Sequence, residues 1–184
     1  MQESEGQPNP FPDRFFLDIP ANQVRAFDGQ NGWIPLPILA AKAQGIGFVD
    51  LPDPAKTSMV EKYRGKVVPS LALCALEMAF DAKARIAPGK SITLADHSIL
   101  LDVENSVPIQ FPAHDQLDYL KFHDLLGGKI VAKQVRGKVV ILGYDGSKIP
   151  KLPSPLGEIG AHRFFIYSLQ DLANRLDSPH SQKK

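Results

Sequence analysis

Helices are predicted wherever apolar residues recur every three or four positions along the chain. The clearest helix is SLALCALEMAFDAKAR, residues 70–85, and Pro69 is well suited to its first turn. Its predicted apolar face holds Leu71, Cys74, Ala75, Met78 and Ala82. A second helix is predicted over residues 34–44, which begins through Pro37 and ends at Gly45.

Two more helices are predicted in the second half of the chain. A short one is expected within residues 115–128, ending at the pair Gly127 and Gly128. A longer amphipathic helix is predicted over residues 158–176, as the closing helix at the end of the domain. This helix offers six large side chains to a core: Phe164, Phe165, Tyr167, Leu169, Leu172 and Leu176.

Strands are predicted where short stretches alternate between apolar and polar residues. SITLA, SILLDV and VPIQF, residues 91–95, 98–103 and 107–111, form a predicted meander. RFFLDI and GFVDL, residues 14–19 and 47–51, are shorter candidates, and AFDGQNGW, residues 26–33, carries turn residues between them. The polar stretch KTSMVEKYRGK, residues 56–66, predicts a strand with one exposed face, followed by a turn at Gly65.

The continuous apolar run KVVIL, residues 138–142, is typical of a strand that is covered on both faces. Together with the helices on either side, it predicts a single α/β domain in which a mixed sheet is flanked by helices. The domain is expected to span residues 13–176, with a flexible arm at residues 1–12 and a flexible tail at residues 177–184.

Composition narrows the class of protein without naming a function. Of the 184 residues, 43% are hydrophobic and 22% are charged, as in an ordinary globular domain. The formal charge of +1 provides no basic excess for binding nucleic acid. No apolar run approaches the roughly 20 residues of a membrane span. The acidic, polar start MQESEGQPNP does not have the pattern of a signal peptide.

The loop after residue 142 has the setting of a nucleotide-binding site but lacks its motifs. In GYDGSKIP, Gly143 and Gly146 do not complete the glycine fingerprint of dinucleotide-binding folds, and Gly146-Ser147-Lys148 does not complete a P-loop. The predicted helix also begins a dozen residues later, too far away for its dipole to meet a bound phosphate. Nucleotide binding is therefore not expected, and no cofactor is predicted.

The remaining reactive residues favour structural roles. Three Asp-His or His-Asp neighbours, at 96–97, 114–115 and 123–124, lack the spacing that presents two imidazoles to one metal ion, so surface turns explain them better. Ser70 lacks the surroundings of a nucleophile and is expected to be a helix-entry hydroxyl. Cys74, the one cysteine, is expected to be an inert core thiol. No catalytic constellation or metal site is predicted.

The order of the motifs is more informative than any one of them. VVPSLALCALEMA at 67–79 is followed by IQFPA at 109–113, FHDLLGG at 122–128, RGKVVILGYDG at 136–146 and PSPLGEIGAHRFFIYSLQDL at 153–172. This succession, with AQGIGFVD at 43–50 before it, resembles the C-terminal portion of the second type of CHASE domain. That family comprises extracellular sensory modules of bacterial adenylyl cyclases, histidine kinases and Ser/Thr kinases.

The resemblance implies a non-enzymatic sensor on the periplasmic or extracellular face of the bacterial membrane. Such a domain would bind an unknown small-molecule or protein signal and act by conformational shift on a cytoplasmic output module in the parent protein. A homodimer is possible. Ligand-binding residues are expected in the loop and at the start of the closing helix: Tyr144, Asp145, Lys148, Ser154, His162 and Arg163.

Two alternatives from other functional classes remain open. A protein–protein interaction or dimerisation module would follow if the domain leaves a sheet edge exposed. A small Ser-dependent hydrolase would need Ser70 or an Asp-His pair to be accessible and correctly placed. His162 and Arg163 also have an alternative interpretation, in which they pack at the start of the closing helix and contact no ligand.

Overall fold

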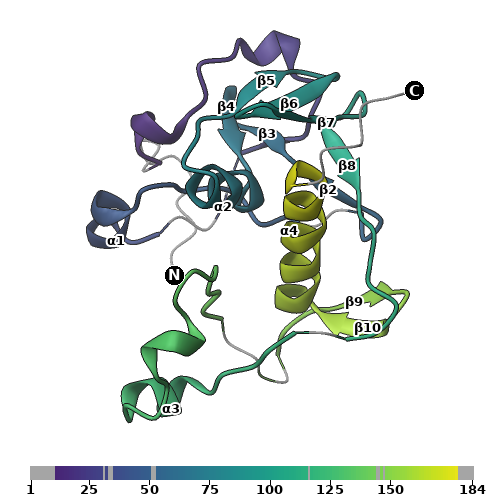
Figure 1. The fold of residues 1–184 in the computed structure, drawn as a ribbon. Helices are drawn as coiled ribbons and strands as arrows, with labels where there is room; N and C mark the ends of the chain where they lie inside the picture. The colour runs from purple at the N-terminus through teal and green to yellow at the C-terminus, as the bar shows by residue number, and fades with distance from the viewer. Residues whose placement is uncertain are drawn as a thin grey trace.

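The structure, a computed structural model, describes residues 11–30, 32, 35–50, 53–115, 117–143, 146 and 148–177. Within these ranges the chain is a mixed α/β fold with four α-helices and four small sheets (Figure 1). The α/β class predicted from sequence is therefore confirmed, although β-strands gather in several small sheets. Residues 1–10 of the predicted arm and 178–184 of the predicted tail lie outside the described residues.

The four helices are separated by the sheets along the chain. They are α1 (Pro37–Lys42), α2 (Leu71–Ala79), α3 (Phe122–Leu126) and α4 (Ala161–Asp177). Three short 3-10 helices span Asp13–Phe15, Ala21–Gln23 and Ala132–Gln134. The predicted entry of α1 at Pro37 is confirmed. Its C-terminal carbonyls are capped by Arg14, which donates to the oxygens of Ala40 and Ala43 at 2.8 and 3.2 Å.

Three of the sheets lie in the first two thirds of the chain. The first contains β1 (Asp28–Gly29), parallel to β3 (Val60–Tyr63), and β4 (Lys66–Pro69), antiparallel to β3. The second pairs β2 (Lys56–Ser58) with β8 (Ser106–Pro108) in antiparallel fashion. The third is the antiparallel meander of β5 (Arg85–Ala87), β6 (Ser91–Leu94) and β7 (His97–Leu100). The predicted strands at SITLA and SILLDV are confirmed as β6 and β7, which pair with each other as predicted. The rest of the predicted meander is wrong: VPIQF overlaps β8 only at Val107 and Pro108, β8 pairs with β2, and the third strand of the meander is β5, which was not predicted.

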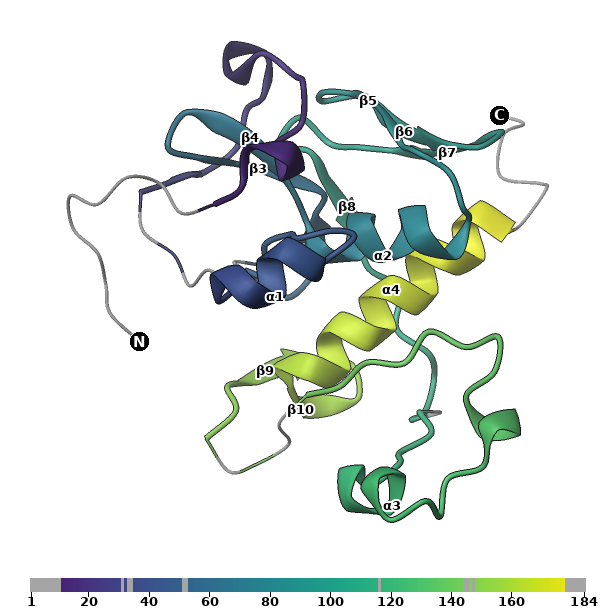
Figure 2. The ribbon, with the colours of Figure 1, turned by 90° about the vertical axis from the view of Figure 1, so that its left-hand side faces the viewer.

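The main core lies between the meander and the two longest helices. Helix α4 packs against α2 and against β7, and Figure 2 shows both helices beneath the meander. The buried side chains of this cluster include Met59, Val60, Leu73, Leu76, Ile92, Leu94, Leu172 and Leu176. Burial of these side chains supplies the main favourable free energy of folding.

A second, smaller cluster surrounds the first half of α4. The antiparallel hairpin of β9 (Lys151–Ser154) and β10 (Gly157–Gly160) leads directly into α4. Ile159, Phe164 and Tyr167 are buried here against Phe111 and its neighbours. Helix α4 therefore spans both clusters, with its N-terminal turns in the small one and its C-terminal turns in the main one (Figure 1).

Residues 117–142 form an arm that extends from the body and carries α3 at its far end (Figures 1 and 2). The predicted helix ending at Gly127 is confirmed as α3. The prediction that residues 138–142 form a strand covered on both faces is wrong: they belong to no strand, and Val139, Val140 and Leu142 are exposed. Gly137, with a left-handed φ of 70°, turns the chain just before this segment.

The extent and orientation of α2 also differ from the prediction. The helix stops at Ala79 rather than Arg85, because Asp81 has a left-handed φ of 46° that cannot continue a helix. Met78, predicted to be in the core, is exposed, whereas Ala72, Leu73 and Leu76 are buried. Pro69 is the last residue of β4 and not part of the first helical turn.

The remaining strand predictions were partly wrong. Residues 14–19 contain a 3-10 helix and a single bridge from Leu17 to Val67, and residues 47–50 contain a single bridge from Phe48 to Ser70. Residues 56–66 form β2 and β3 and turn at Gly65 as predicted, but several of their side chains are buried. Asp28 and Gly29, predicted in a turn, form β1.

Candidate functional site

A surface hollow lies where the predicted loop meets the start of α4. Its volume is about 400 Å³. Residues from the arm, the loop, the β9–β10 hairpin and α4 line it: Tyr119, Gly146, Ile149, Lys151, Glu158, Gly160 and Arg163. The lining offers an ammonium group, a guanidinium group, a carboxylate and a phenol. Such a mixture can orient a small polar molecule through both donors and acceptors.

Arg163 is held in place by Asp115, which comes from the chain segment after β8. The Asp115 carboxylate accepts hydrogen bonds from Nη2 of Arg163 and from the hydroxyl of Tyr167. The bond from Tyr167, together with that from Arg163, lowers the pKa of Asp115 below its ordinary value. Arg163 also lies over the Tyr119 ring, with Cζ 5.8 Å from the ring centroid. These contacts fix the guanidinium at the edge of the hollow.

The hydrogen-bonding capacity of Arg163 is not used up by these contacts. Its Nε is buried and has no hydrogen-bond partner among the residues that the structure describes. A guanidinium carries five N–H donors, and an unpaired buried donor costs free energy. Arg163 therefore keeps one N–H donor that no described residue uses.

The other predicted ligand-binding residues are brought together only in part. The exposed His162 ring lies against Gly143, where an added Cβ would come within 2.2 Å of its Cδ2 atom. Lys148 is exposed and does not line the hollow. Ser154 closes the β9–β10 turn: its hydroxyl donates to the Gly157 oxygen at 2.7 Å and accepts from the Leu156 nitrogen at 3.1 Å. Tyr144 and Asp145 lie outside the described residues.

Four residues of the site were not predicted from sequence. Asp115 had been interpreted as part of a surface turn with His114, yet it anchors Arg163 across 48 positions. Tyr119, Lys151 and Glu158 reach the hollow from three different segments. The sequence did carry one signal for Lys151 and Glu158, because both lie close to the Pro-rich loop that forms the β9–β10 hairpin. Asp115 and Tyr119 gave no signal beyond their polar character.

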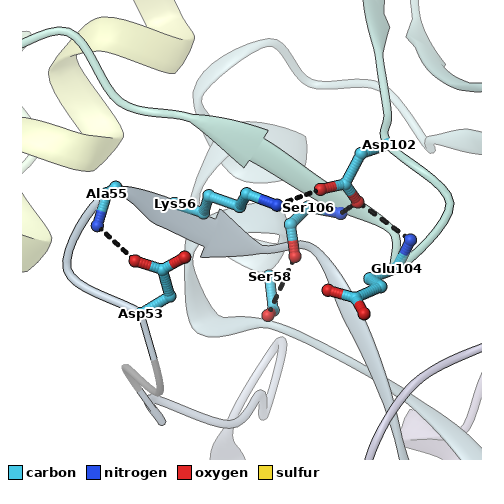
Figure 3. A network of polar contacts seen from close by, with 7 residues as sticks. All are labelled: Asp53, Ala55, Lys56, Ser58, Asp102, Glu104 and Ser106. Carbon is cyan, nitrogen blue, oxygen red and sulfur yellow. Dashed lines mark hydrogen bonds and ion pairs between the residues drawn. The ribbon is translucent and has the colours of Figure 1, made fainter.

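A second polar network joins β2 to the β7–β8 connection and has a structural role (Figure 3). Lys56 donates to Asp102 at 2.8 Å, and the other oxygen of Asp102 accepts the backbone N–H groups of Glu104 and Ser106, each at 2.9 Å. The hydroxyls of Ser58 and Ser106 lie 3.2 Å apart across the paired strands. Because its acceptors are engaged within the fold, Asp102 organises the turn that positions β8 against β2.

Ser70 and Cys74 have the structural roles predicted for them. The Ser70 hydroxyl is the N-cap of α2 and accepts the Leu73 N–H at 3.0 Å. Cys74 is buried, and burial, followed by the nearby charge of Glu77, raises the pKa of its thiol to about 11. In the described ranges, no three His, Cys, Asp or Glu side chains gather as they would around a metal ion.

In comparisons with known proteins, no family model, no curated protein and no solved structure matches this chain. None of the described helices is both long enough and apolar enough to cross a membrane. The geometry of the hollow is therefore the observation on which a functional proposal can be built.

Proposed function

We propose that this chain is the signal-binding part of a bacterial transmembrane signalling protein, and that it binds a small polar molecule in the hollow beside Arg163. The observation that carries the proposal is the hollow itself. It lies at the loop and helix start where the order of sequence motifs had already predicted ligand binding, and Arg163 is common to both. The resemblance to CHASE domains supports a position on the outer face of the membrane and an output module inside the cell.

The chemistry of the lining favours a ligand with at least one anionic group. Lys151 and Arg163 supply cations from two separate elements, and Glu158 supplies an acceptor for a donor or a positive group on the ligand. Amino acids and small dicarboxylic acids fit this arrangement. A guanidinium and an ammonium can each pair with a carboxylate through charge-assisted hydrogen bonds.

The position of α4 gives such a ligand a route to the rest of the domain. The helix begins at the hollow and ends in the main core, where it packs on α2 and β7. A ligand that binds one orientation of the first turn of α4 more tightly would shift the population of whole-domain arrangements. The size of that shift is limited by the difference in affinity between the arrangements.

A thermal-shift screen with amino acids, dicarboxylic acids, inorganic phosphate and sulfate tests this proposal. A compound at 100 times its dissociation constant stabilises the fold by about 2.7 kcal/mol, which raises the melting temperature by a few degrees. Lys151→Gln is expected to weaken binding roughly tenfold or more by removing a charged partner. Lys148→Gln is the matched control, because Lys148 is exposed and does not line the hollow.

Two outcomes would contradict the proposal. If none of these compound classes shifts the melting temperature of the folded chain, the hollow does not bind the proposed chemistry. If a compound binds equally well to the wild type, to Lys151→Gln and to Glu158→Gln, its site lies elsewhere on the chain.

A further inference from the structure

The arm carries an apolar surface that the described fold does not cover. Its large exposed side chains, which we call the arm surface, are Tyr119, Leu120, Phe122, Leu125, Leu126, Val131, Val139, Val140 and Leu142. Phe122, Leu125 and Leu126 occupy one face of α3, since they are spaced three and four positions apart. Soluble monomers seldom expose an apolar patch larger than a few hundred Å². An arm of this composition therefore indicates an interaction surface.

Segment 138–142 has the properties of a strand without a partner. Val139, Val140 and Leu142 are 57%, 59% and 72% exposed, whereas Ile141 packs against the main core. No backbone–backbone hydrogen bond joins residues 139–142 to another residue in the described part of the chain. Free backbone groups beside β-branched side chains favour the addition of a strand from another molecule.

We propose that the arm surface is a homodimer interface, in which segments 138–142 of two copies pair as antiparallel strands. A standard interface takes roughly 800 Å² from each partner, and the arm surface offers nine large apolar side chains that are each about half exposed or more. A two-fold axis requires the same patch on both copies, and a single apolar patch satisfies that condition.

The sequence of the segment suits a symmetric register centred on Val140. In that register Val140 faces Val140 of the other copy, Val139 faces Ile141, and Lys138 faces Leu142. No two charged residues within the segment are opposite one another, so like-charge repulsion across the strands is avoided. Ile141 remains directed toward its own core, because alternate residues of a strand point to opposite faces. The proposed strand pairing uses no residue of the hollow, since residues 138–142 are not among its lining; Tyr119 is the residue that the arm surface and the hollow share.

Sedimentation velocity of the full chain over a concentration series tests the interface. The wild type is expected to shift from one to two protomer masses as its concentration rises. Val140→Asp places two carboxylates opposite each other in the proposed register, and it is expected to raise the dimer dissociation constant at least about tenfold. Val103→Asp is the matched control, since Val103 is 62% exposed but lies outside the arm. It is expected to leave the dissociation constant unchanged.

Cross-linking gives a second measurement that does not depend on the stability of the aspartate variant. Val140→Cys brings two thiols together on the two-fold axis, within the Cα separation that a disulfide spans. Cys74, the one native cysteine, gives little background because it is buried and its thiol pKa is raised. Mild oxidation is expected to link Val140→Cys into dimers much faster than Val103→Cys.

Three results would overturn the proposal. A wild type that stays monomeric at every concentration would exclude the homodimer. A dimer that tolerates Val140→Asp as well as Val103→Asp would place the interface elsewhere. Equal cross-linking rates for the two cysteine variants would rule out the symmetric register.

Discussion

Asn105 connects three parts of the chain that are far apart in the sequence. Its side chain donates to the Arg25 oxygen at 3.0 Å and accepts the Gly89 N–H at 2.7 Å. Its backbone oxygen accepts the Met59 N–H at 2.9 Å. It also has a left-handed φ of 63°, which asparagine tolerates better than most residues. This buried residue therefore fixes a turn, and nothing in the local sequence distinguishes it from an ordinary polar loop residue.

Glu61 is an unusual carboxyl group, because it lies buried in β3. Burial, with the nearby charge of Asp50 as a smaller cause, raises its pKa from 4.5 to about 7. Folding therefore favours the protonated form of this side chain. Between pH 4.5 and 7 the folded chain holds a proton that the unfolded chain releases, so stability falls as the pH rises through that window.

Glu61→Gln is expected to remove this part of the pH dependence, since an amide does not titrate. At pH 8 the variant should be more stable than the wild type by roughly 1–3 kcal/mol, because the wild type must bury a charge there. Urea unfolding at pH 5 and pH 8 measures the difference, with Glu104→Gln on the surface as the control for losing a carboxylate. A wild type whose stability does not fall between these two pH values would contradict the prediction.

At the scale of elements, residues 45–48 lie very close to the junction of β4 and α2. The Phe48 N–H donates to the Pro69 oxygen at 3.1 Å, and the Leu71 N–H donates to the Phe48 oxygen at 2.8 Å. A Cβ added at Gly47 would lie 2.3 Å from the Ser70 carbonyl carbon. Backbone atoms cannot move aside as a flexible side chain can, so this approach requires glycine.

Gly47→Ala is expected to destabilise the fold by at least about 2 kcal/mol, because the chain must shift to admit the methyl group. Gly29→Ala is the matched control, since the nearest atoms to its added Cβ are 3.7 Å away, an ordinary contact. Chemical unfolding of both variants gives the comparison. Equal stabilities would show that residues 45–48 can move away from α2 at little cost.

The elements that the sequence predicted well are those whose signals are local. Helix α1 begins at Pro37, α3 ends before Gly127, and the paired strands β6 and β7 follow short alternating stretches. The failures involve partners that are distant in the sequence. Residues 14–19 and 47–50 have strand-like composition but form only single bridges, because strand formation depends on a neighbouring backbone.

For the whole molecule, α4 is the element that holds the two apolar clusters together. The main cluster includes Leu169, Leu172 and Leu176, and the small one includes Phe164 and Tyr167. Arg175 adds a further link, since it donates to the Pro108 oxygen at the end of β8. The arm packs on these clusters near its two ends, through Leu117 and Ile141, whereas most of its other large side chains are exposed.

Native-state hydrogen exchange at low protein concentration is expected to separate these regions. Amides of α2, β6 and the second half of α4 should exchange only through global unfolding, whereas those of the arm should exchange with opening free energies within about 2 kcal/mol of zero. Repeating the measurement at high concentration serves as a control for self-association at residues 138–142. Arm protection equal to that of α2 at low concentration would contradict this view of the fold.

The candidate site was only partly predictable from sequence. The loop and the start of α4 were identified, and Arg163 does line the hollow. Lys148 and Ser154 were expected to bind ligand as well, but Lys148 does not line the hollow and Ser154 closes the β9–β10 turn. Asp115 was missed because its partners, Arg163 and Tyr167, lie about 50 positions further along.

The sequence by itself determined the mixed α/β class, most helix positions, the strands β6 and β7, and the structural roles of Ser70 and Cys74. These features depend on periodicity, capping and composition within a few turns of chain. Only the tertiary structure decided which face of α2 is buried, that Val139, Val140 and Leu142 lie exposed, and that Lys151 and Arg163 come to one hollow, where Asp115 holds Arg163. The physical reason is that long-range packing and strand pairing depend on which distant segments meet, and local patterns do not encode that choice.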